Sequence, residues 1–293
     1  NHDSAERLAS CAGLLDKAGL YLQGAVQREP RVVEFADSQV FFLPWITEEK
    51  IKSLYPEERD GITDLTDAYR VAVNHMREKF ILGKHHLLLS HAFITNAETS
   101  TSDRAAEIGF ATQVPASVFE GFDYVALGHI HKPQQVNPFI RYSGSPMAYS
   151  FGKEERQEKS VTLIDTAAMT QEVVPLPLLH RWTTLTDSYE ALLAGEYPEE
   201  IREGYVRLNV TDTAVGLDML SRLRQVYPNA LVVAGKTYDG EDTTITLTME
   251  QLEQMESDPA EVFKSFCREE MGQEATDHFL QLFAQAVEEA DAE

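Results

Sequence analysis

The sequence predicts an α/β or α+β layered fold over residues 1–178, followed by a smaller α+β unit. Short apolar strand-like runs alternate with helical stretches in the first part. A proline-rich segment then interrupts the pattern, and a second, shorter series of strands and helices follows it. The chain has 293 residues, of which 43% are hydrophobic, so it can bury a sizeable core and suits one large domain or two.

The first part begins with a helical stretch. Residues 4–19 carry apolar side chains at helical spacing, and Gly19 suits a C-cap. A long helix is expected from about Asp64 to Phe80, and PASVFEGF predicts a short one. Strands are predicted at RVVEFA, QVFFLPWI, HHLLLSHAF and DYVALGHIH, and two more at IRYSGSPMAYSF and KSVTLID, joined by a Gly-Ser-Pro turn.

A boundary is predicted near residue 178, where VVPLPLLHRW carries two prolines within three residues and suits a linker. Residues 179–256 then give the smaller unit, with strands at YVRLNVT, ALVVAGKTY and TTITLTM and a helix at LDMLSRLRQVY. Residues 257–293 predict two amphipathic helices, the first capped by Asp258 and Pro259. Packing within the chain is one role for this tail, but its phenylalanines also leave apolar area for a partner.

Composition argues against some classes of protein and of binding partner. No apolar run approaches the roughly 20 residues that cross a bilayer, and two cysteines make no disulfide framework, so we expect a cytoplasmic protein. With 25 basic and 48 acidic side chains the formal net charge is −23, which argues against nonspecific DNA binding by the chain as a whole. DNA binding in one local groove remains an alternative. The candidate phosphate contacts there are Lys132, Arg141, Lys153, Arg156 and Lys159.

Polar residues gather at the start of the chain and at strand ends. The chain opens with Asn-His-Asp, three side chains that are rarely packed in a core and that offer lone pairs or protons to a metal or a phosphate. His91 follows a buried-strand pattern, as do His129 and His131. In extended backbone these last two imidazoles would point the same way, and Gly128 permits close approach. One histidine alone is usually a satisfied polar residue, but this combination predicts a site.

The motifs NHD, SHAF and GHIH, in this order, resemble the later motifs of the calcineurin-like metallophosphoesterase superfamily. Within it, FDYVALGHIHKPQ, IRYSGSPMAYSFGKEE and KSVTLID closely resemble the SbcD nuclease-subunit family, over nearly the whole chain. The resemblance implies a β-sandwich flanked by helices for residues 1–178, the nuclease domain. It implies a capping domain at 179–256 that arranges DNA over the metals, and C-terminal helices at 257–293 that bind a partner ATPase.

The resemblance also implies the metal ligands. Asn1, His91 and His129 would bind the second ion of a two-manganese site, and His131 would bind the first. Imidazole, carboxamide and carboxylate ligands suit manganese, with Mg²⁺ as a possible substitute. Such an ion pair activates a water and neutralises charge on the phosphate, which phosphodiester hydrolysis requires.

The resemblance also implies catalytic roles for the remaining residues of the first motif. His2 would face the scissile phosphate, stabilising the transition state or protonating the leaving oxygen, and Asp3 would orient it. A histidine outside the coordination shell has an ordinary pKa of about 6.5 and can donate a proton near neutral pH.

The sequence departs from the family pattern in one respect. The pattern includes an earlier Asp-x-His for the first metal and a Gly-Asp whose aspartate bridges both ions, and neither occurs in the sequence. The first metal therefore keeps only His131. We expect that the chain starts inside the nuclease domain, lacking its N-terminal strands, and that as written it holds metal poorly and is inactive.

The function implied for the complete protein is that of an ATP-dependent 3′-to-5′ exonuclease on double-stranded DNA ends, with endonuclease activity on hairpins and single strands, in DNA repair, recombination and replication. The implied partner is an SbcC-type coiled-coil ATPase, in a heterotetramer of two nuclease and two ATPase subunits. ATP would bind that partner, since Gly235-Lys236-Thr237 lies in a strand pattern and lacks the rest of a phosphate-binding loop.

Two alternatives stay open. One is a metallophosphoesterase acting on a small phosphodiester, and the other is a non-catalytic scaffold that binds DNA ends. An upstream Asp-x-His would favour the nuclease over the scaffold. Structural or surface roles are expected for the Ser143–Pro146 turn and for the histidines outside the motifs, namely His75, His85, His86, His180 and His278.

Overall fold

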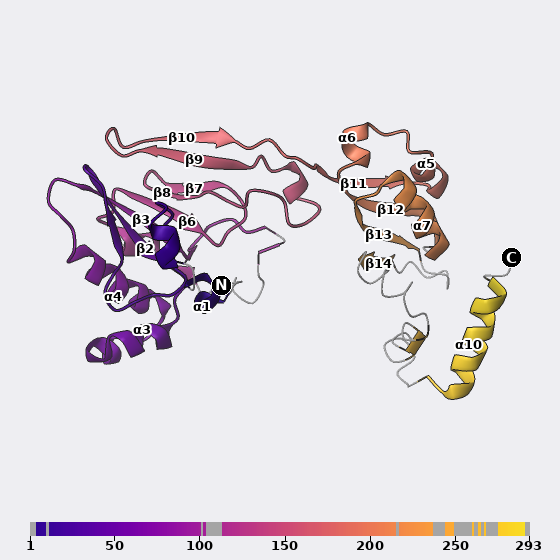
Figure 1. The fold of residues 1–293 in the computed structure, drawn as a ribbon, viewed down its shortest axis with the longest axis horizontal. Helices are drawn as coiled ribbons and strands as arrows, with labels where there is room; N and C mark the ends of the chain where they lie inside the picture. Colours follow the sequence, from indigo (N-terminus) through magenta and orange to yellow (C-terminus); the bar gives the residue numbers. More distant parts are fainter. Residues whose placement is uncertain are drawn as a thin grey trace. The chain divides into compact units, whose positions relative to one another are not determined.

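The computed structural model divides into two compact units, residues 1–178 and 179–293, which are described one at a time (Figure 1). The predicted capping segment, 179–256, and the predicted tail, 257–293, both fall in the second unit, and their separation stays a prediction. The residues that the structure describes are 4–9, 12–100, 102–103, 113–214, 217–236, 244–248, 260, 263–264, 267 and 275–290.

The first unit is built on a six-stranded sheet with the order β1-β2-β3-β6-β8-β7. The four central strands are parallel, and the two edge strands pair antiparallel to their neighbours. Because parallel strands end at the same edge of a sheet, β3 and β6 deliver the residues that follow them to one place. The strands are β1 (Val32–Glu34), β2 (Ser38–Leu43), β3 (His85–His91), β6 (Tyr124–Gly128), β7 (Gln134–Asn137) and β8 (Ile140–Tyr142).

Helices pack against this sheet through one apolar cluster. The predicted long helix is present as α4 (Leu65–Arg77), whose buried face includes Tyr69, Val73 and Met76. Tyr69 also donates a hydrogen bond to the backbone carbonyl of His91 at 3.0 Å, so the helix fixes the end of β3. The other helical elements of this region are α3 (Glu48–Leu54), η1 (Pro56–Gly61) and the predicted short helix, a 3₁₀ turn, η4 (Ala116–Phe119).

The start of α4 makes folding sensitive to acid. The Asp67 carboxylate accepts hydrogen bonds from the Thr63 hydroxyl at 2.6 Å and the Thr63 N–H at 3.0 Å, and it pairs with Arg70. These contacts lower the pKa of Asp67 from 3.8 to about 2. A carboxyl group whose pKa is lower in the folded state contributes stability above its unfolded pKa, and this stability is lost as the pH falls through the folded value.

We therefore expect the free energy of unfolding to fall by about 1–2 kcal/mol between about pH 4 and pH 2 through this group, since solvent screens part of the interaction. Asp67→Asn should remove this part of the acid sensitivity in urea titrations at each pH. Asp60→Asn, at an exposed position of the same region, is the control. Equal acid sensitivity in Asp67→Asn and the unaltered protein would contradict the assignment.

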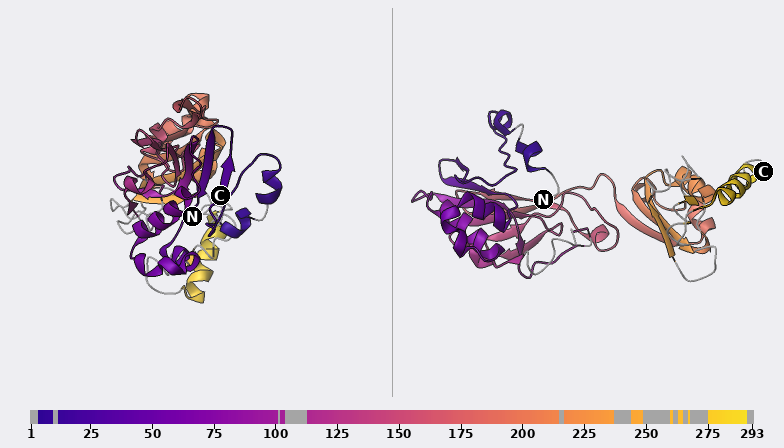
Figure 2. Two further views of the ribbon diagram at one scale, coloured as in Figure 1. Left: turned by 90° about the vertical axis from the view of Figure 1, so that its left-hand side faces the viewer. Right: turned by 90° about the horizontal axis from the view of Figure 1, so that it is seen from below.

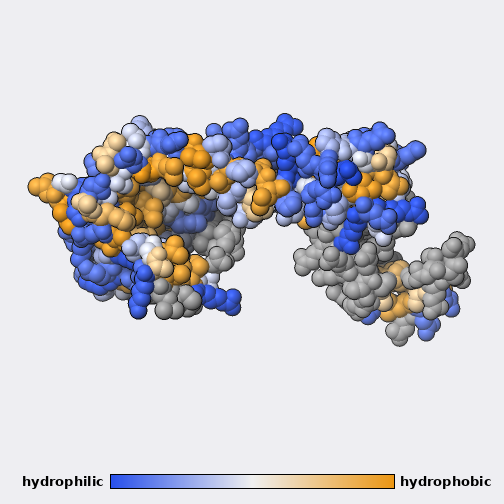
Figure 3. All heavy atoms as spheres, turned by 45° about the horizontal axis from the view of Figure 1, so that its top comes forward, coloured by the Kyte–Doolittle hydropathy of each residue, from blue (hydrophilic) through white to orange (hydrophobic). Residues whose placement is uncertain are grey.

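Two smaller sheets complete the first unit. β4 (Phe93–Ile94) pairs with β5 (Gln113–Val114), and β9 (Ser160–Asp165) forms a hairpin with β10 (Thr170–Pro175). Part of the predicted linker VVPLPLLHRW is therefore strand, which corrects the prediction: Pro175 has no N–H to donate, but it can occupy the end of an edge strand. The face drawn in Figure 3 mixes apolar and polar residues, and the hairpin exposes Val161, Leu163 and Val173.

Two further expectations for the first unit are revised. The predicted helix over residues 4–19 contains two short helices, α1 (Ala5–Ala9) and α2 (Ala12–Asp16), and residues 10–11 lie outside the described chain. IRYSGSPMAYSF is strand only over β8, because Gly144 takes a left-handed conformation with φ +77° that ends the extended run. A short 3₁₀ helix, η5 (Glu154–Arg156), follows this loop.

The second unit contains a four-stranded sheet with the order β11-β12-β13-β14, in which only β14 is antiparallel to its neighbour (Figure 2). Its core holds Leu208, Leu223 and Tyr227, and the Tyr227 hydroxyl donates to the Leu192 carbonyl at 2.9 Å. The predicted strands and helix are present. The elements are β11 (Trp182–Asp187), α5 (Tyr189–Ala194), α6 (Glu199–Arg202), β12 (Tyr205–Ala214), α7 (Leu217–Val226), β13 (Ala230–Lys236), β14 (Thr244–Thr248) and α10 (Asp277–Ala290).

The mixed α/β architecture with several sheets agrees with the predicted fold class. Gly235 and Lys236 lie inside β13, so they form no phosphate-binding loop. Within the part of the chain that the structure describes, no helix is long and apolar enough to span a bilayer.

Candidate functional site

His91 and His129 meet at the carboxyl edge of the central sheet. β3 and β6 pair in parallel with His91 opposite Gly128, so His129 follows one residue later at the same edge. The two rings have centroids 5.2 Å apart at an angle of 74°. A Cβ on Gly128 would lie 3.0 Å from Nδ1 of His91, closer than such atoms normally approach. Glycine at this position is therefore what allows the His91 ring to lie against β6.

The backbone at His129 differs from the expectation. The prediction placed His129 and His131 on extended backbone, but β6 ends at Gly128 and His129 has φ +92°. A side chain other than glycine in this region costs about 1–3 kcal/mol, and such residues cluster at functional sites. His129 is nevertheless buried, and Trp45 stacks on its ring with centroids 5.1 Å apart. The surrounding packing holds the strained conformation.

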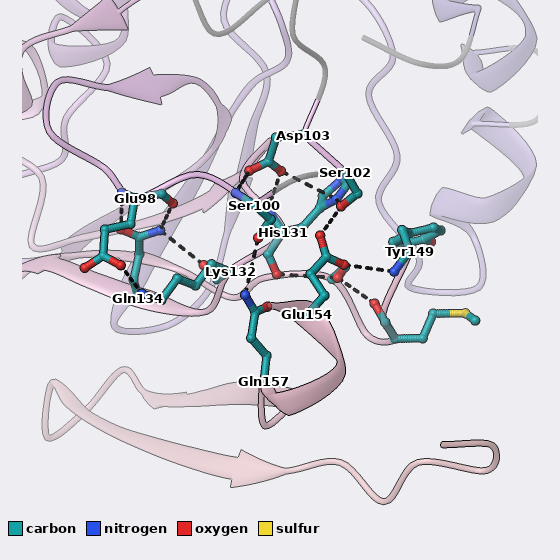
Figure 4. Close-up of polar contacts among 12 residues, drawn as sticks. Glu98, Ser100, Ser102, Asp103, His131, Lys132, Gln134, Tyr149, Glu154 and Gln157 are labelled. Carbon is teal, nitrogen blue, oxygen red and sulfur yellow. Dashed lines mark hydrogen bonds and ion pairs between the residues drawn. The ribbon is translucent and has the colours of Figure 1, made fainter. Parts of the chain in front are cut away.

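His131 is held by polar groups of the segment around residue 102 (Figure 4). Its Nδ1 lies 2.6 Å from the Ser102 hydroxyl and 3.5 Å from a carboxylate oxygen of Asp103. The His131 N–H also donates to this oxygen at 2.9 Å. The Asp103 side chain is fully buried, and its second oxygen accepts from the Ser100 N–H at 2.5 Å. Asp103 thus ties the His131 backbone to the segment around residue 102.

A buried carboxylate and a buried ammonium lie behind His131. Glu154 is 1% exposed; it accepts hydrogen bonds from the Ser102 hydroxyl and, at 2.9 Å, from the Tyr149 N–H. Lys159 is 2% exposed, and its Nζ donates to the Ser145 hydroxyl at 3.0 Å. This hydroxyl in turn donates to the Met147 carbonyl at 2.6 Å.

Burial disfavours the charged form of both groups, and hydrogen bonds and neighbouring charges oppose this effect. Burial raises the pKa of Glu154, but the hydrogen bonds from Ser102 and Tyr149 and the charge of Lys159 outweigh it, so the pKa lies below its usual value. Burial lowers the pKa of Lys159, and the carboxylates of Glu154 and Asp103 oppose this shift. Each charge therefore depends on the other for its stability in the interior.

The three histidines of the SHAF and GHIH motifs line one cavity of about 640 Å³, together with Ser102, Ser145 and Tyr149. A neighbouring cavity of about 500 Å³ extends from His91 past Trp45 to more apolar residues. Histidines from two separate strand ends, His91 on one side and His129 and His131 on the other, therefore line one cavity.

The donor set fits a divalent ion between His91 and His129. An imidazole nitrogen binds such an ion at about 2.1 Å, so two rings bound at a right or tetrahedral angle have centroids roughly 4.5 to 5.2 Å apart. The observed 5.2 Å lies at the upper end of this range. Within the described ranges no group of three or more His, Cys, Asp and Glu side chains has the geometry of a metal site, so an ion between these two histidines would need further ligands.

Asn1, His2 and Asp3, the predicted ligand and catalytic residues of the first motif, lie outside the described residues. The candidate phosphate contacts need one correction. Lys159 was one of the candidates, but its ammonium is buried against Ser145 and cannot reach a phosphate. Lys132 pairs with Glu98, and Arg141 donates to Thr162 at 3.1 Å, while Lys153 and Arg156 are exposed.

Histidines outside the motifs have structural contacts, as expected. His75 stacks on Tyr55 with centroids 4.2 Å apart and lies 2.6 Å from a Glu58 carboxylate oxygen. His86 stacks on Phe80 at 3.7 Å, and burial lowers its pKa. Neither ring lines the cavity of the three motif histidines.

Sequence reasoning missed the residues that support His131. Ser102 and Asp103 lie in a stretch without a chemical motif, and their role follows only from tertiary contacts. Glu154 and Lys159 lie in a run of charged letters, which favours a surface position for both. The one signal was that Glu154 lies in IRYSGSPMAYSFGKEE, a segment that carries the family resemblance.

Comparisons with known proteins show which families and proteins this chain is similar to. Residues 178–271 match the SbcD_C family, described as the Type 5 capsule protein repressor C-terminal domain. The chain is 28% identical over 243 residues to the SbcD component of the SbcCD nuclease of Staphylococcus epidermidis, which covers 82% of this chain and 64% of that protein. It is 26% identical over 242 residues, with the same coverage, to the protein of the same name from Staphylococcus saprophyticus. The chain therefore spans 64% of the length of these relatives.

Proposed function

We propose that this chain, an SbcD-type protein, is the nuclease subunit of an SbcCD-type complex and hydrolyses phosphodiester bonds of DNA with the help of bound metal ions. The observation that carries the proposal is the meeting of His91, His129 and His131 in one cavity at the carboxyl edge of the sheet. The names of the two Staphylococcus proteins, which describe each as a component of the SbcCD nuclease, support the reaction class and the complex.

The proposed cofactor is a pair of manganese ions, for which Mg²⁺ can substitute. His91 and His129 would hold one ion with Asn1, and His131 would hold the other. When bound, such a pair would supply activation of a water molecule and neutralisation of charge on the phosphate. The chain's own contribution is placement: Tyr69 holds the His91 carbonyl, Trp45 packs on the His129 ring, and the buried groups around Ser102 hold His131.

The first motif supplies the proton chemistry in this proposal. His2 would lie beside the scissile phosphate and stabilise the transition state or protonate the leaving oxygen, and Asp3 would orient its ring. An imidazole suits this role because its ordinary pKa of about 6.5 allows both protonation states near neutral pH.

The proposed substrates and partner follow the family resemblance. The substrates are double-stranded DNA ends, degraded from 3′ to 5′, and hairpins or single strands cut internally, as part of DNA repair in the cytoplasm. An SbcC-type ATPase would bind the helices of residues 257–293, two copies of each protein would assemble, and residues 179–256 would arrange the DNA.

A non-catalytic DNA-end scaffold is the second candidate. The observation that favours it is the partial ligand set, because the described residues alone do not complete a metal site. A scaffold would bind DNA ends as tightly without manganese as with it, which separates it from a nuclease.

The test is nucleotide release from a blunt linear duplex by the protein in its full native length, with the ATPase partner, ATP and Mn²⁺. His129→Ala should slow release more than about 100-fold, because altering even an outer partner of a metal ligand costs roughly 10- to 100-fold. His85→Ala, at the opposite end of β3 from His91, should leave the rate unchanged.

The proposal fails if His129→Ala cuts at the rate of the unaltered protein while melting at the same temperature. If the unaltered protein releases no nucleotide with Mn²⁺ but retards the duplex in a gel, the scaffold replaces the nuclease.

A further inference from the structure

His131 is fixed at its backbone as well as at its ring. Its N–H donates to Asp103 at 2.9 Å, and its carbonyl accepts from the Ser145 N–H at 3.0 Å. The Lys159 ammonium lies 3.5 Å from the same carbonyl. The ring can therefore turn only about its side-chain bonds, and the group that meets Nδ1 decides how it is held.

Donor and acceptor can be assigned in each hydrogen bond that links Glu154, Ser102 and Nδ1 of His131, starting from Glu154. An ionised carboxylate accepts hydrogen bonds and donates none. One oxygen of Glu154 accepts from the Tyr149 N–H at 2.9 Å, and the other is bonded to the Ser102 hydroxyl. Ser102 has a single hydroxyl proton, so this proton points to Glu154 and the serine oxygen presents a lone pair to His131.

This direction determines which ring nitrogen of His131 carries the proton. The Ser102 oxygen, 2.6 Å from Nδ1, can only accept, so Nδ1 must carry the proton. The neutral ring then has its lone pair on Nε2. Asp103 does not set this arrangement, because its oxygen lies 3.5 Å from Nδ1, too far for a hydrogen bond of ordinary length.

We propose that Glu154 is a positioning residue that acts through the Ser102 hydroxyl, holding His131 with its proton on Nδ1 and its Nε2 lone pair available to a divalent cation. Binding of a cation at this position rests on the proposed function, but the predicted tautomer of His131 does not. Ligating histidines commonly donate their other N–H to a carboxylate or a water, and here a serine carries this role from a carboxylate one hydrogen bond further away.

Glu154→Gln reverses the chain of hydrogen bonds at almost constant shape. The Tyr149 N–H still needs an acceptor, so the new amide oxygen should face Tyr149 and the new NH₂ should face Ser102. The serine oxygen must then accept from the amide, and its proton turns to Nδ1 of His131. The variant should therefore place the ring proton on Nε2 and remove the lone pair that a cation needs.

The first readout is the tautomer of His131. Long-range ¹H–¹⁵N spectra of the ¹⁵N-histidine-labelled chain, recorded without metal at about pH 8, above the ordinary imidazole pKa of about 6.5, distinguish the two neutral forms. His131→Gln identifies the resonances. We expect the Nδ1–H form in the unaltered chain and in the control Glu158→Gln, which removes the same charge at an exposed position. We expect the Nε2–H form in Glu154→Gln.

The second readout is binding of Mn²⁺ alone, followed by the loss of the free-ion signal in electron paramagnetic resonance. Glu154→Gln should bind about 10- to 100-fold more weakly than Glu158→Gln, the range found for outer partners of ligating histidines. Ser102→Ala interrupts the relay while leaving Glu154 in place. It should likewise weaken binding and give a mixture of tautomers, which covers the case in which Glu154→Gln folds poorly.

The outcomes separate this inference from the proposed function. An Nδ1–H ring in both Glu154→Gln and Ser102→Ala would overturn the positioning role, whatever the metal affinity. A switch of tautomer in Glu154→Gln, in a chain that binds no Mn²⁺ in any form, would support the positioning role and count against the metal-dependent nuclease.

Discussion

Lys159→Met should lower the free energy of unfolding by about 3–5 kcal/mol, the usual cost of removing one member of a buried pair of charges. The lysine is 2% exposed and Glu154 is 1% exposed, so neither charge can turn to water when its partner is lost. The substitution also takes the Nζ donor away from the Ser145 hydroxyl. Urea unfolding at pH 7 measures the change.

Two further variants test the reason for this loss. Lys153→Met, on the exposed side of the same segment, should change stability by less than about 0.5 kcal/mol. In a Glu154→Gln background, Lys159→Met should cost at least about 1 kcal/mol less, because the carboxylate that it compensates is gone. If the two substitutions simply add, the loss arises from packing around the lysine stem rather than from the charge.

Gly144→Ala should destabilise the first unit by about 2–6 kcal/mol. Gly144 has φ +77°, where a residue other than glycine costs about 1–3 kcal/mol. A Cβ there would lie 2.7 Å from three atoms of Pro133, which adds the cost of overpacking, about 1–3 kcal/mol. The midpoint of urea unfolding should fall without a change in its slope.

Gly152→Ala separates the two causes in Gly144→Ala. Gly152 also has a positive φ, +95°, but no atom lies within 4 Å of the position that its Cβ would take. It should therefore show the backbone strain alone, about 1–3 kcal/mol. Equal losses in the two variants would mean that Pro133 moves aside without cost.

The strands that carry the motif histidines were predictable because the sequence features that indicate them are local. HHLLLSHAF and DYVALGHIH are apolar runs that end in polar letters, and β3 and β6 occupy them. The parallel sheet then brings His91 beside Gly128 by register alone. Periodicity and residue type are enough for such elements, since both are properties of a short window of sequence.

The surroundings of His131 could not be predicted in the same way. Ser102 is 29 residues from His131 and 52 from Glu154, and no local pattern signals contacts over such separations. The backbone of His129 was mispredicted because a run of strand-like letters does not reveal where the strand ends. Buried Lys159 has the same letters around it as a surface lysine, and its burial follows from tertiary contacts with Ser145 and the His131 carbonyl.

The left-handed backbone at His129 has a consequence for how this position tolerates change. Glycine, and to a lesser degree asparagine, would relieve the backbone strain, but neither offers an imidazole to the cavity. Glycine would also leave a void beside Trp45, where the buried ring now packs. The histidine at 129 therefore combines the backbone conformation that suits it least with the side-chain packing and the proposed metal ligand that glycine cannot supply.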